Sequence, residues 1–200
     1  MTYKESIQTS INVKERLMKD DVALSAYEHI AVELKEVYRT GHKLMVAGNG
    51  GSAADAQHFV AEITCQYQKR RGGRPAIALT SNTSELTAWG NDHSFDTIFS
   101  RLVEAHGVAG DALVVISTSG NSENLIQATK MAKKNGIKVF GLLGNDGGTI
   151  ALQCDRAVIV PSKETPRIQE CHITLIHSIC AELDEFFVQE DRHTAEDIGR

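Results

Sequence analysis

His58 and Glu62 are four residues apart, in a segment that follows a glycine-rich loop. On a helix, residues at this spacing project from one face, so an imidazole nitrogen and a carboxylate oxygen could bind the same metal ion. A solvent-exposed polar pair is the alternative, because many helices carry such pairs at i and i+4. The position of the pair, directly downstream of the loop, favours the metal site.

The loop has the sequence Gly48-Asn49-Gly50-Gly51-Ser52 and follows an apolar run. Glycines at a turn from strand to helix let backbone N–H groups approach a ligand at the helix N-terminus, where the helix dipole favours anions or carbonyl oxygens. The spacing of Gly48, Gly50 and Ala53 also loosely fits a dinucleotide-binding loop, but no Asp or Glu stands about 20 residues on to hold a ribose. A tight turn with only a structural role is the third possibility.

A second polar cluster, Ser117-Thr118-Ser119-Gly120-Asn121-Ser122, follows the apolar run 113–116 and precedes a helical pattern. Hydroxyls and free amides at a helix N-terminus bind phosphate without a lysine. A helix cap needs only one Ser or Asn, whereas five of these six residues have short polar side chains. We therefore expect a phosphate site here, since open α/β sheets bind ligands at the carboxyl ends of their strands.

Two further groups of polar residues are ambiguous from the sequence. Asn91 and Asp92 lie between a helical segment and Phe95, where a turn or a helix cap is expected. Gln169 and His177 are eight residues apart on a helical pattern, which separates them by about 12 Å along a straight helix. One metal ion can bind both residues only through long side chains, an irregular helix start or a second subunit.

The strands that position these residues follow from the hydrophobic pattern. Short apolar runs alternate with helical segments, at 44–47, 76–79, 113–116, 139–143 and 157–160. This alternation predicts a parallel, doubly wound sheet of five strands in a three-layer α/β sandwich.

Helical patterns lie at both ends of the chain. The apolar positions of 27–38 recur every three or four residues and predict a helix that ends at Thr40 or Gly41, and apolar residues at 7, 11 and 18 indicate an earlier helix. We expect this helical segment, residues 1–41, to pack against other subunits. A stripe of apolar residues over 168–187 predicts a long closing helix, and the polar sequence from Gln189 predicts a frayed tail, 189–200. No linker or repeat divides the single domain predicted for residues 1–200.

Composition excludes several classes of protein. The 26 acidic and 21 basic residues are interspersed, and the net charge of −5 argues against binding to nucleic acid. The sequence has no apolar run long enough to span a membrane and no apolar leader, so we expect a cytoplasmic protein. The four cysteines lack CxxC spacing and are expected to be reduced and buried, without a disulfide framework.

Four blocks of this sequence together resemble the phosphoheptose isomerases of the sugar isomerase (SIS) family. The blocks are 48–62, which holds the glycine loop with His58 and Glu62; Gly90-Asn91-Asp92; 117–122; and Arg167-Ile168-Gln169-Glu170 with His177. The similarity covers residues 4–187. Four blocks in the same order make the resemblance far more specific than any one loop.

The resemblance implies an SIS fold, which is flavodoxin-like, and a homotetramer with active sites at subunit interfaces. It implies one zinc ion per subunit, bound by His58, Glu62, Gln169 and His177. It places the sugar on Asn49, Gly50, Gly51, Glu62, Asn91, Asp92 and Gln169, and the phosphate on Ser117, Thr118, Ser119 and Ser122. The implied reaction converts sedoheptulose 7-phosphate into D-glycero-D-manno-heptose 7-phosphate, the first step of nucleotide-activated heptose biosynthesis, with Glu62 and His177 as the catalytic base and acid.

This sequence departs from the family at Gln66, where the family has an arginine four residues after the metal-site glutamate. Lys69, Arg70 and Arg71 are nearby cations that could compensate.

The resemblance leaves two other functions open. One is a non-catalytic SIS-fold protein of the type that associates with the bacterial replication initiator, a branch that does not keep the metal-site Glu and His. The other is an isomerase of a different sugar phosphate, whose common forms carry a further regulatory or amidotransferase domain.

Overall fold

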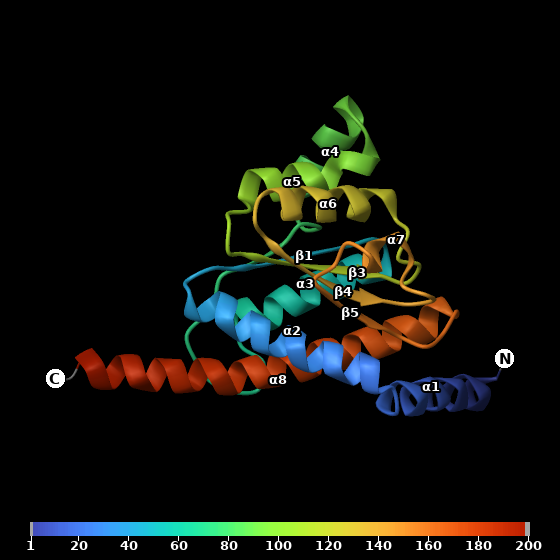
Figure 1. Ribbon diagram of the computed structural model, residues 1–200, viewed down its shortest axis with the longest axis horizontal. Helices are drawn as coiled ribbons and strands as arrows, with labels where there is room; N and C mark the ends of the chain where they lie inside the picture. Colours follow the sequence, from blue (N-terminus) through green and yellow to red (C-terminus); the bar gives the residue numbers. More distant parts are fainter. Residues whose placement is uncertain (1, 199–200) are drawn as a thin grey trace.

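The computed structural model describes residues 2–198, with the side chains of residues 2–192. Five parallel strands form one sheet in the order β2-β1-β3-β4-β5, and helices cover both of its faces (Figure 1). The strands are β1 (Leu44–Gly48), β2 (Ala76–Ala78), β3 (Ala112–Ser117), β4 (Lys138–Leu143) and β5 (Arg156–Ile159). The sheet and the three-layer α/β sandwich predicted from the sequence are therefore confirmed.

Each face of the sheet has its own core. The helices on one face are α2 (Asp21–Arg39), α3 (Gly51–Thr64) and α8 (Thr165–Ile198), and those on the other are α5 (Ile98–His106) and α6 (Glu123–Lys134). Side chains alternate along a strand, so Leu44 and Val46 pack with the first group of helices, and Met45 and Ala47 pack with the second. Strands buried on both faces are apolar throughout, which is why the sequence shows them as continuous runs.

The remaining elements are short or peripheral. They are α1 (Tyr3–Met18), α4 (Thr83–Asp92), the 3-10 helix η1 (Phe95–Thr97) and α7 (Gly148–Ala151). Thr2 and Glu5 form a capping box at the start of α1, in which each side chain bonds the backbone N–H of the other residue. Helix α4 has no buried residue and stands at the edge of the molecule, at the top of Figure 1.

The structure confirms the helices predicted over 27–40 and 168–187, which are α2 and α8. Helix α2 ends at Arg39 with Thr40 as its C-cap, and Gly41 follows with φ 81°. Helix α8 continues to Ile198, so the frayed tail expected from Gln189 onward is wrong as far as the described backbone extends. Residues 199 and 200 of that tail lie outside the described residues.

The cysteines are all free in the part of the chain that the structure describes. Cys171 and Cys180 are buried, as expected, and Cys154 is half-buried. Cys65 is exposed at the C-terminal end of α3, so the expectation of burial is wrong for this residue. No helix between residues 2 and 198 is long and apolar enough to cross a bilayer.

His172 is a fully buried polar residue of α8. Its Nε2 donates a hydrogen bond of 3.0 Å to the carbonyl oxygen of Leu143, the last residue of β4, and its Nδ1 has no partner among the described atoms. Burial lowers the pKa of His172 from 6.5 to about 4, although the bond to Leu143 acts in the opposite direction. The imidazole is therefore neutral in the folded protein at neutral pH.

We predict that His172 makes the protein less stable as the pH falls from 7 to 4.5. The unfolded chain takes up a proton near pH 6.5 while the folded chain does not, so the free energy of unfolding falls over this range by about 2 to 3 kcal/mol. Denaturant unfolding at both pH values measures this loss. His172→Gln should be less stable than wild type at pH 7 but should lose less stability on acidification, and an equal loss in both proteins would contradict the assignment.

Candidate active site

The glycine loop after β1 forms one wall of a cleft at the carboxyl end of the sheet. Gly50 has φ 56°, a conformation that side-chain-bearing L-residues rarely adopt. A Cβ at Gly51 would collide with the side-chain amide of Gln169, which comes from the start of α8. The two glycines therefore allow the turn into α3 and the close approach of Gln169.

The polar segment after β3 forms the opposite wall. The Oγ of Ser117 accepts a hydrogen bond of 3.1 Å from the backbone N–H of Gly120, which closes a tight turn. Ser122 is the N-cap of α6, but its hydroxyl makes no capping bond to the helix. The segment is thus built as a turn with a hydroxyl left available at a helix N-terminus, which suits an anion.

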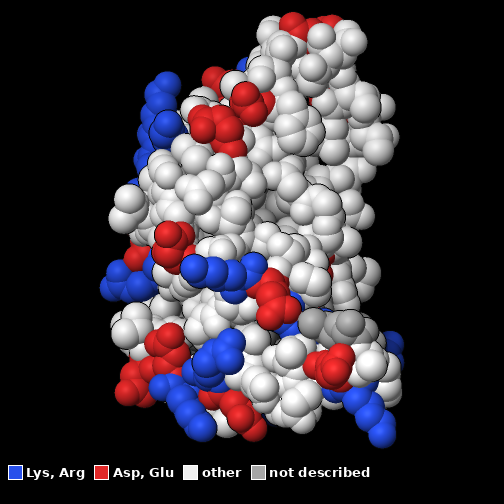
Figure 2. Space-filling model, turned by 90° about the vertical axis from the view of Figure 1, so that its right-hand side faces the viewer, with Lys and Arg blue, Asp and Glu red and all other residues white. Residues whose placement is uncertain are grey.

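The cleft between these two loops has a volume of about 300 Å³. Its lining includes Asn49, Gly50, Gly51, Ser117, Thr118, Ser122 and Gln169, which are seven of the predicted substrate-binding residues. Ser119 is not in the lining; its Oγ accepts a bond of 3.2 Å from the N–H of Asn121. Figure 2 looks onto this end of the molecule, where uncharged residues surround a central hollow.

Asn124 links the two walls, and sequence reasoning missed it. Its side-chain amide and that of Asn49 exchange two hydrogen bonds of 2.9 Å each. Asn124 is buried in the first turn of α6. It lies four residues before Ala128 and therefore falls on the buried stripe of the helix, and a polar residue on such a stripe is the signal that could have found it.

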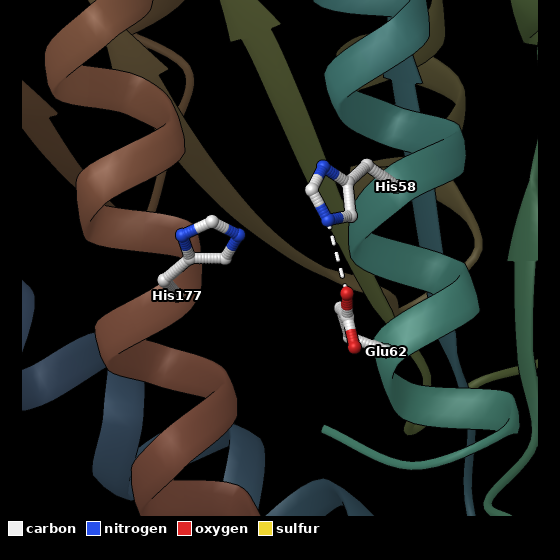
Figure 3. A group of neighbouring side chains, drawn as sticks. All are labelled: His58, Glu62 and His177. Carbon is white, nitrogen blue, oxygen red and sulfur yellow. Dashed lines mark hydrogen bonds and ion pairs between the residues drawn. The ribbon is translucent and has the colours of Figure 1, made fainter. Parts of the chain in front are cut away.

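His58 and Glu62 of α3 face His177 of α8, two turns beyond the cleft (Figure 3). His58 Nε2 and Glu62 Oε1 are 2.9 Å apart, and the ligand atoms of all three residues lie within 4.8 Å of one another. The rings of His58 and His177 meet edge to face, with centroids 5.1 Å apart. Two imidazoles and a carboxylate form a donor set that zinc prefers, so these three residues fit the predicted metal.

Gln169, the fourth predicted ligand, lies at the cleft and not beside His177. Helix α8 is continuous between the two residues, which separates them by about 12 Å along its axis. Helices α3 and α8 run in the same direction here, because Gln169 contacts Gly51 at one end and His177 faces His58 two turns later. The structure therefore brings three of the four predicted ligands together.

Two residues beside this cluster carry no sequence prediction. The ring of Tyr67 stacks on that of His177, with centroids 5.5 Å apart and an interplanar angle of 18°. Asp55 lies one turn before His58 on α3 and has a buried oxygen, Oδ2, without a hydrogen-bond partner. Burial raises the pKa of Asp55, and His58 partly offsets this. A buried carboxylate oxygen next to His58 is a further group that could orient a metal-binding imidazole.

Two other sequence predictions concern residues away from the cleft. Asn91 and Asp92 form the last turn of α4, where both are exposed and Asn91 Nδ2 donates to Asp92 Oδ1 at 2.8 Å. They do not line the cleft of this chain. Gln66 is exposed, as is Arg70, whereas Arg71 forms a buried ion pair with Asp184 and cannot supply a cation to the substrate.

Known proteins similar to this chain belong to the family that the four sequence blocks resemble. The model of the SIS domain family matches residues 6–144. The phosphoheptose isomerase of Aneurinibacillus thermoaerophilus is 50% identical over 182 residues, which are 91% of this chain and 92% of that protein. Two solved phosphoheptose isomerases superpose with 92% of this chain and 100% of their own: that of Neisseria gonorrhoeae with a TM-score of 0.84 and 43% identity, and that of Francisella tularensis with 0.86 and 34%.

We predict that Thr118→Val combined with Ser122→Ala weakens the binding of inorganic phosphate tenfold or more. Each hydrogen bond to a charged group is worth about 1.5 to 3 kcal/mol, and neither hydroxyl caps the helix, so stability should change little. Calorimetric titration with phosphate measures the effect. Thr149→Val is the matched control, because its hydroxyl donates to Asn121 outside the cleft. A double variant that melts early yet binds phosphate normally would show that the segment is only structural.

Proposed function

Because this chain belongs to the SIS domain family and, within it, to the phosphoheptose isomerases, we propose that it converts sedoheptulose 7-phosphate into D-glycero-D-manno-heptose 7-phosphate. The observation that carries this proposal is the meeting of His58, Glu62 and His177 on the helices that border the cleft. The enzyme is an aldose–ketose isomerase. We place it in the cytoplasm, at the first step of nucleotide-activated heptose biosynthesis.

The reaction moves a carbonyl group between C2 and C1 of the open-chain sugar. A base takes a proton from C1 of the ketose and an acid protonates the oxygen on C2, which gives an enediol; protonation at C2 and loss of the proton from the C1 hydroxyl then give the aldose. Glu62 serves as the base, and His177 exchanges protons with the two oxygens. The alternative of a non-catalytic binding protein is not favoured, because this chain keeps both residues and matches enzymes over most of its length.

Zinc, when bound, supplies a Lewis acid that stabilises the negative charge on the sugar oxygens. His58, Glu62 and His177 would hold it, with Gln169 as the fourth ligand implied by the family. Since Gln169 lies about 12 Å from His177 along α8, it reaches the metal only through a local rearrangement or from another subunit. Its position at the cleft also lets its amide bind the substrate.

The phosphate anchors the substrate in the cleft, two helical turns from His58 and His177. Ser117, Thr118 and Ser122 bind it through hydroxyls and the N-terminus of α6, with Ser119, outside the cleft lining of this chain, as a further ligand implied by the family. Asn49 with Gly50 and Gly51 bind the sugar. Because the phosphate does not take part in the reaction, its binding energy is used to orient the reacting carbons. Asn91 and Asp92 are exposed on α4, and we assign them to the active site of a neighbouring subunit.

A homotetramer fits the exposed apolar surface of the N-terminal helices. Tyr3, Ile7, Ile11 and Met18 lie on one stripe of α1 and are between 43% and 79% exposed. A cavity of about 370 Å³ with a mainly apolar lining lies between α1, α2 and α8. An apolar stripe of this length on the surface is typical of a subunit interface.

We predict that the purified protein isomerises sedoheptulose 7-phosphate and contains about one zinc ion per chain. Glu62→Gln should lower kcat by a factor of about 100 or more, because loss of a general base typically costs this much. A coupled assay for the aldose product and metal analysis provide the measurements. Full activity of the wild-type protein after exhaustive chelation would contradict the metal site. A kcat of the Glu62→Gln variant within tenfold of the wild-type value would contradict the role of Glu62 as base.

We predict that light scattering finds a tetramer and that Ile7→Glu with Ile11→Glu dissociates it, because two charges would enter an apolar interface. The variant should also lose activity if neighbouring subunits complete the site. Asn12→Glu is the matched control, because Asn12 is exposed on the same helix and lies outside the stripe. A fully active monomer of either the wild type or the double variant would contradict the shared site.

A further inference from the structure

A buried ion pair joins the loop after α3 to helix α8. Arg71 Nε donates to Asp184 Oδ1 at 2.7 Å, and both side chains are only 1% exposed. Asp184 lies on α8 seven residues after His177, which is two turns. A buried ion pair is costly to desolvate, so it is weak evidence for stability alone and invites a search for what it positions.

The same guanidinium binds the end of the helix that carries His58 and Glu62. Arg71 Nη2 donates to the carbonyl oxygen of Glu62 at 2.7 Å, and Nη1 donates to that of Ile63 at 2.8 Å. These carbonyls belong to the last turn of α3, where no further helical N–H is available to them. One side chain therefore ties the C-terminal end of α3 to α8.

Asp184 fixes a third component of the site. Its Oδ2 accepts hydrogen bonds from the backbone N–H groups of Gln68 at 2.7 Å and Lys69 at 2.9 Å. Tyr67 precedes them, and its ring stacks on His177. Burial by itself would raise the pKa of Asp184, but the bonds from Lys69, Arg71 and Gln68 outweigh it and hold the pKa below its usual value. The carboxylate is therefore ionised and holds both the loop and the arginine.

We propose that Arg71 and Asp184 are positioning residues that set the separation of Glu62 on α3 from His177 on α8, an inference that rests on the proposed function. Three links converge on the same place: Arg71 holds the backbone of Glu62, Asp184 holds the loop of Tyr67, and Asp184 shares a helix with His177. A metal ion and a base–acid pair both depend on that separation, because ligand atoms must be held close to their bonding positions.

The chain offers a matched control in Arg74. Its guanidinium lies over the ring of Phe187 with the same 4.9 Å separation as that of Arg71, and it also pairs with an aspartate of α8, Asp191. The side chain of Arg74, however, donates to Gly72, Gly73 and Phe187 and not to α3. Arg74→Met thus removes an ion pair to α8 and a cation–π contact without releasing the end of α3.

The experiment compares Arg71→Met and Arg74→Met with wild type in the full-length protein. Zinc affinity is measured by competition with a chromophoric chelator, metal geometry by the visible absorption of the cobalt-loaded protein, and kcat and KM at saturating zinc. Arg71→Met should weaken zinc binding tenfold or more, alter the cobalt spectrum and lower kcat, while KM and phosphate affinity stay within threefold. Arg74→Met should stay within threefold of wild type in every measurement.

A folded Arg71→Met protein with wild-type zinc affinity and cobalt spectrum would overturn the inference. If Arg71→Met does not fold, Asp184→Asn takes its place, because it keeps the shape of the side chain while it removes the charge and replaces one acceptor oxygen with a donating amide; the same readouts and thresholds then decide. A wild-type protein that neither binds zinc nor isomerises the sugar would overturn the proposed function and this inference together. Normal wild-type behaviour with an unaffected variant would overturn the positioning role alone.

Discussion

The strands β1 and β3 are hydrogen-bonded neighbours, yet the chain leaves them toward opposite faces of the sheet. Helix α3 follows β1 on one face, and α6 follows β3 on the other. At such a switch point the two connections diverge and leave a crevice outside the carboxyl ends of the strands. The glycine loop and the serine-rich segment are those two connections, so the order of the strands determines where a ligand can bind.

The cluster of His58, Glu62 and His177 depends on a second consequence of this topology. Because α3 and α8 cover the same face and run in the same direction, residues two turns from the cleft on each helix come together. Ala56, Phe59 and Ile63 form the buried face of α3 and pack in the core. His58 and Glu62 project from the more exposed side of the helix. A cluster two helical turns from the cleft can act on a sugar whose phosphate is held between the two loops.

Patterns within short segments predict most of this fold, and contacts between distant segments account for what was missed. The five strands appear as apolar runs because both of their sides are buried, and the two loops stand out by composition. Arg71 and Asp184 are 113 residues apart and look like ordinary charged residues in the sequence, since nothing local marks them as buried. The stacking of the Tyr67 ring on His177 is likewise a contact between distant segments that nothing local in the sequence indicates. Gln169 shows the limit most clearly, because helix geometry indicated the conflict with His177 but could not resolve it.

Helix α8 carries Gln169 at the cleft, His177 beside His58 and Glu62, and Asp184 at the ion pair without interruption. An α-helix has a fixed rise per residue, so the backbone positions that carry these three side chains keep a constant spacing over about 22 Å. A shift of α8 along its axis at one end therefore displaces the other end by the same amount. Substrate that shifts the helix at Gln169 along its axis therefore also shifts His177 or strains the anchor at Asp184, which couples occupancy of the cleft to the arrangement of His58, Glu62 and His177.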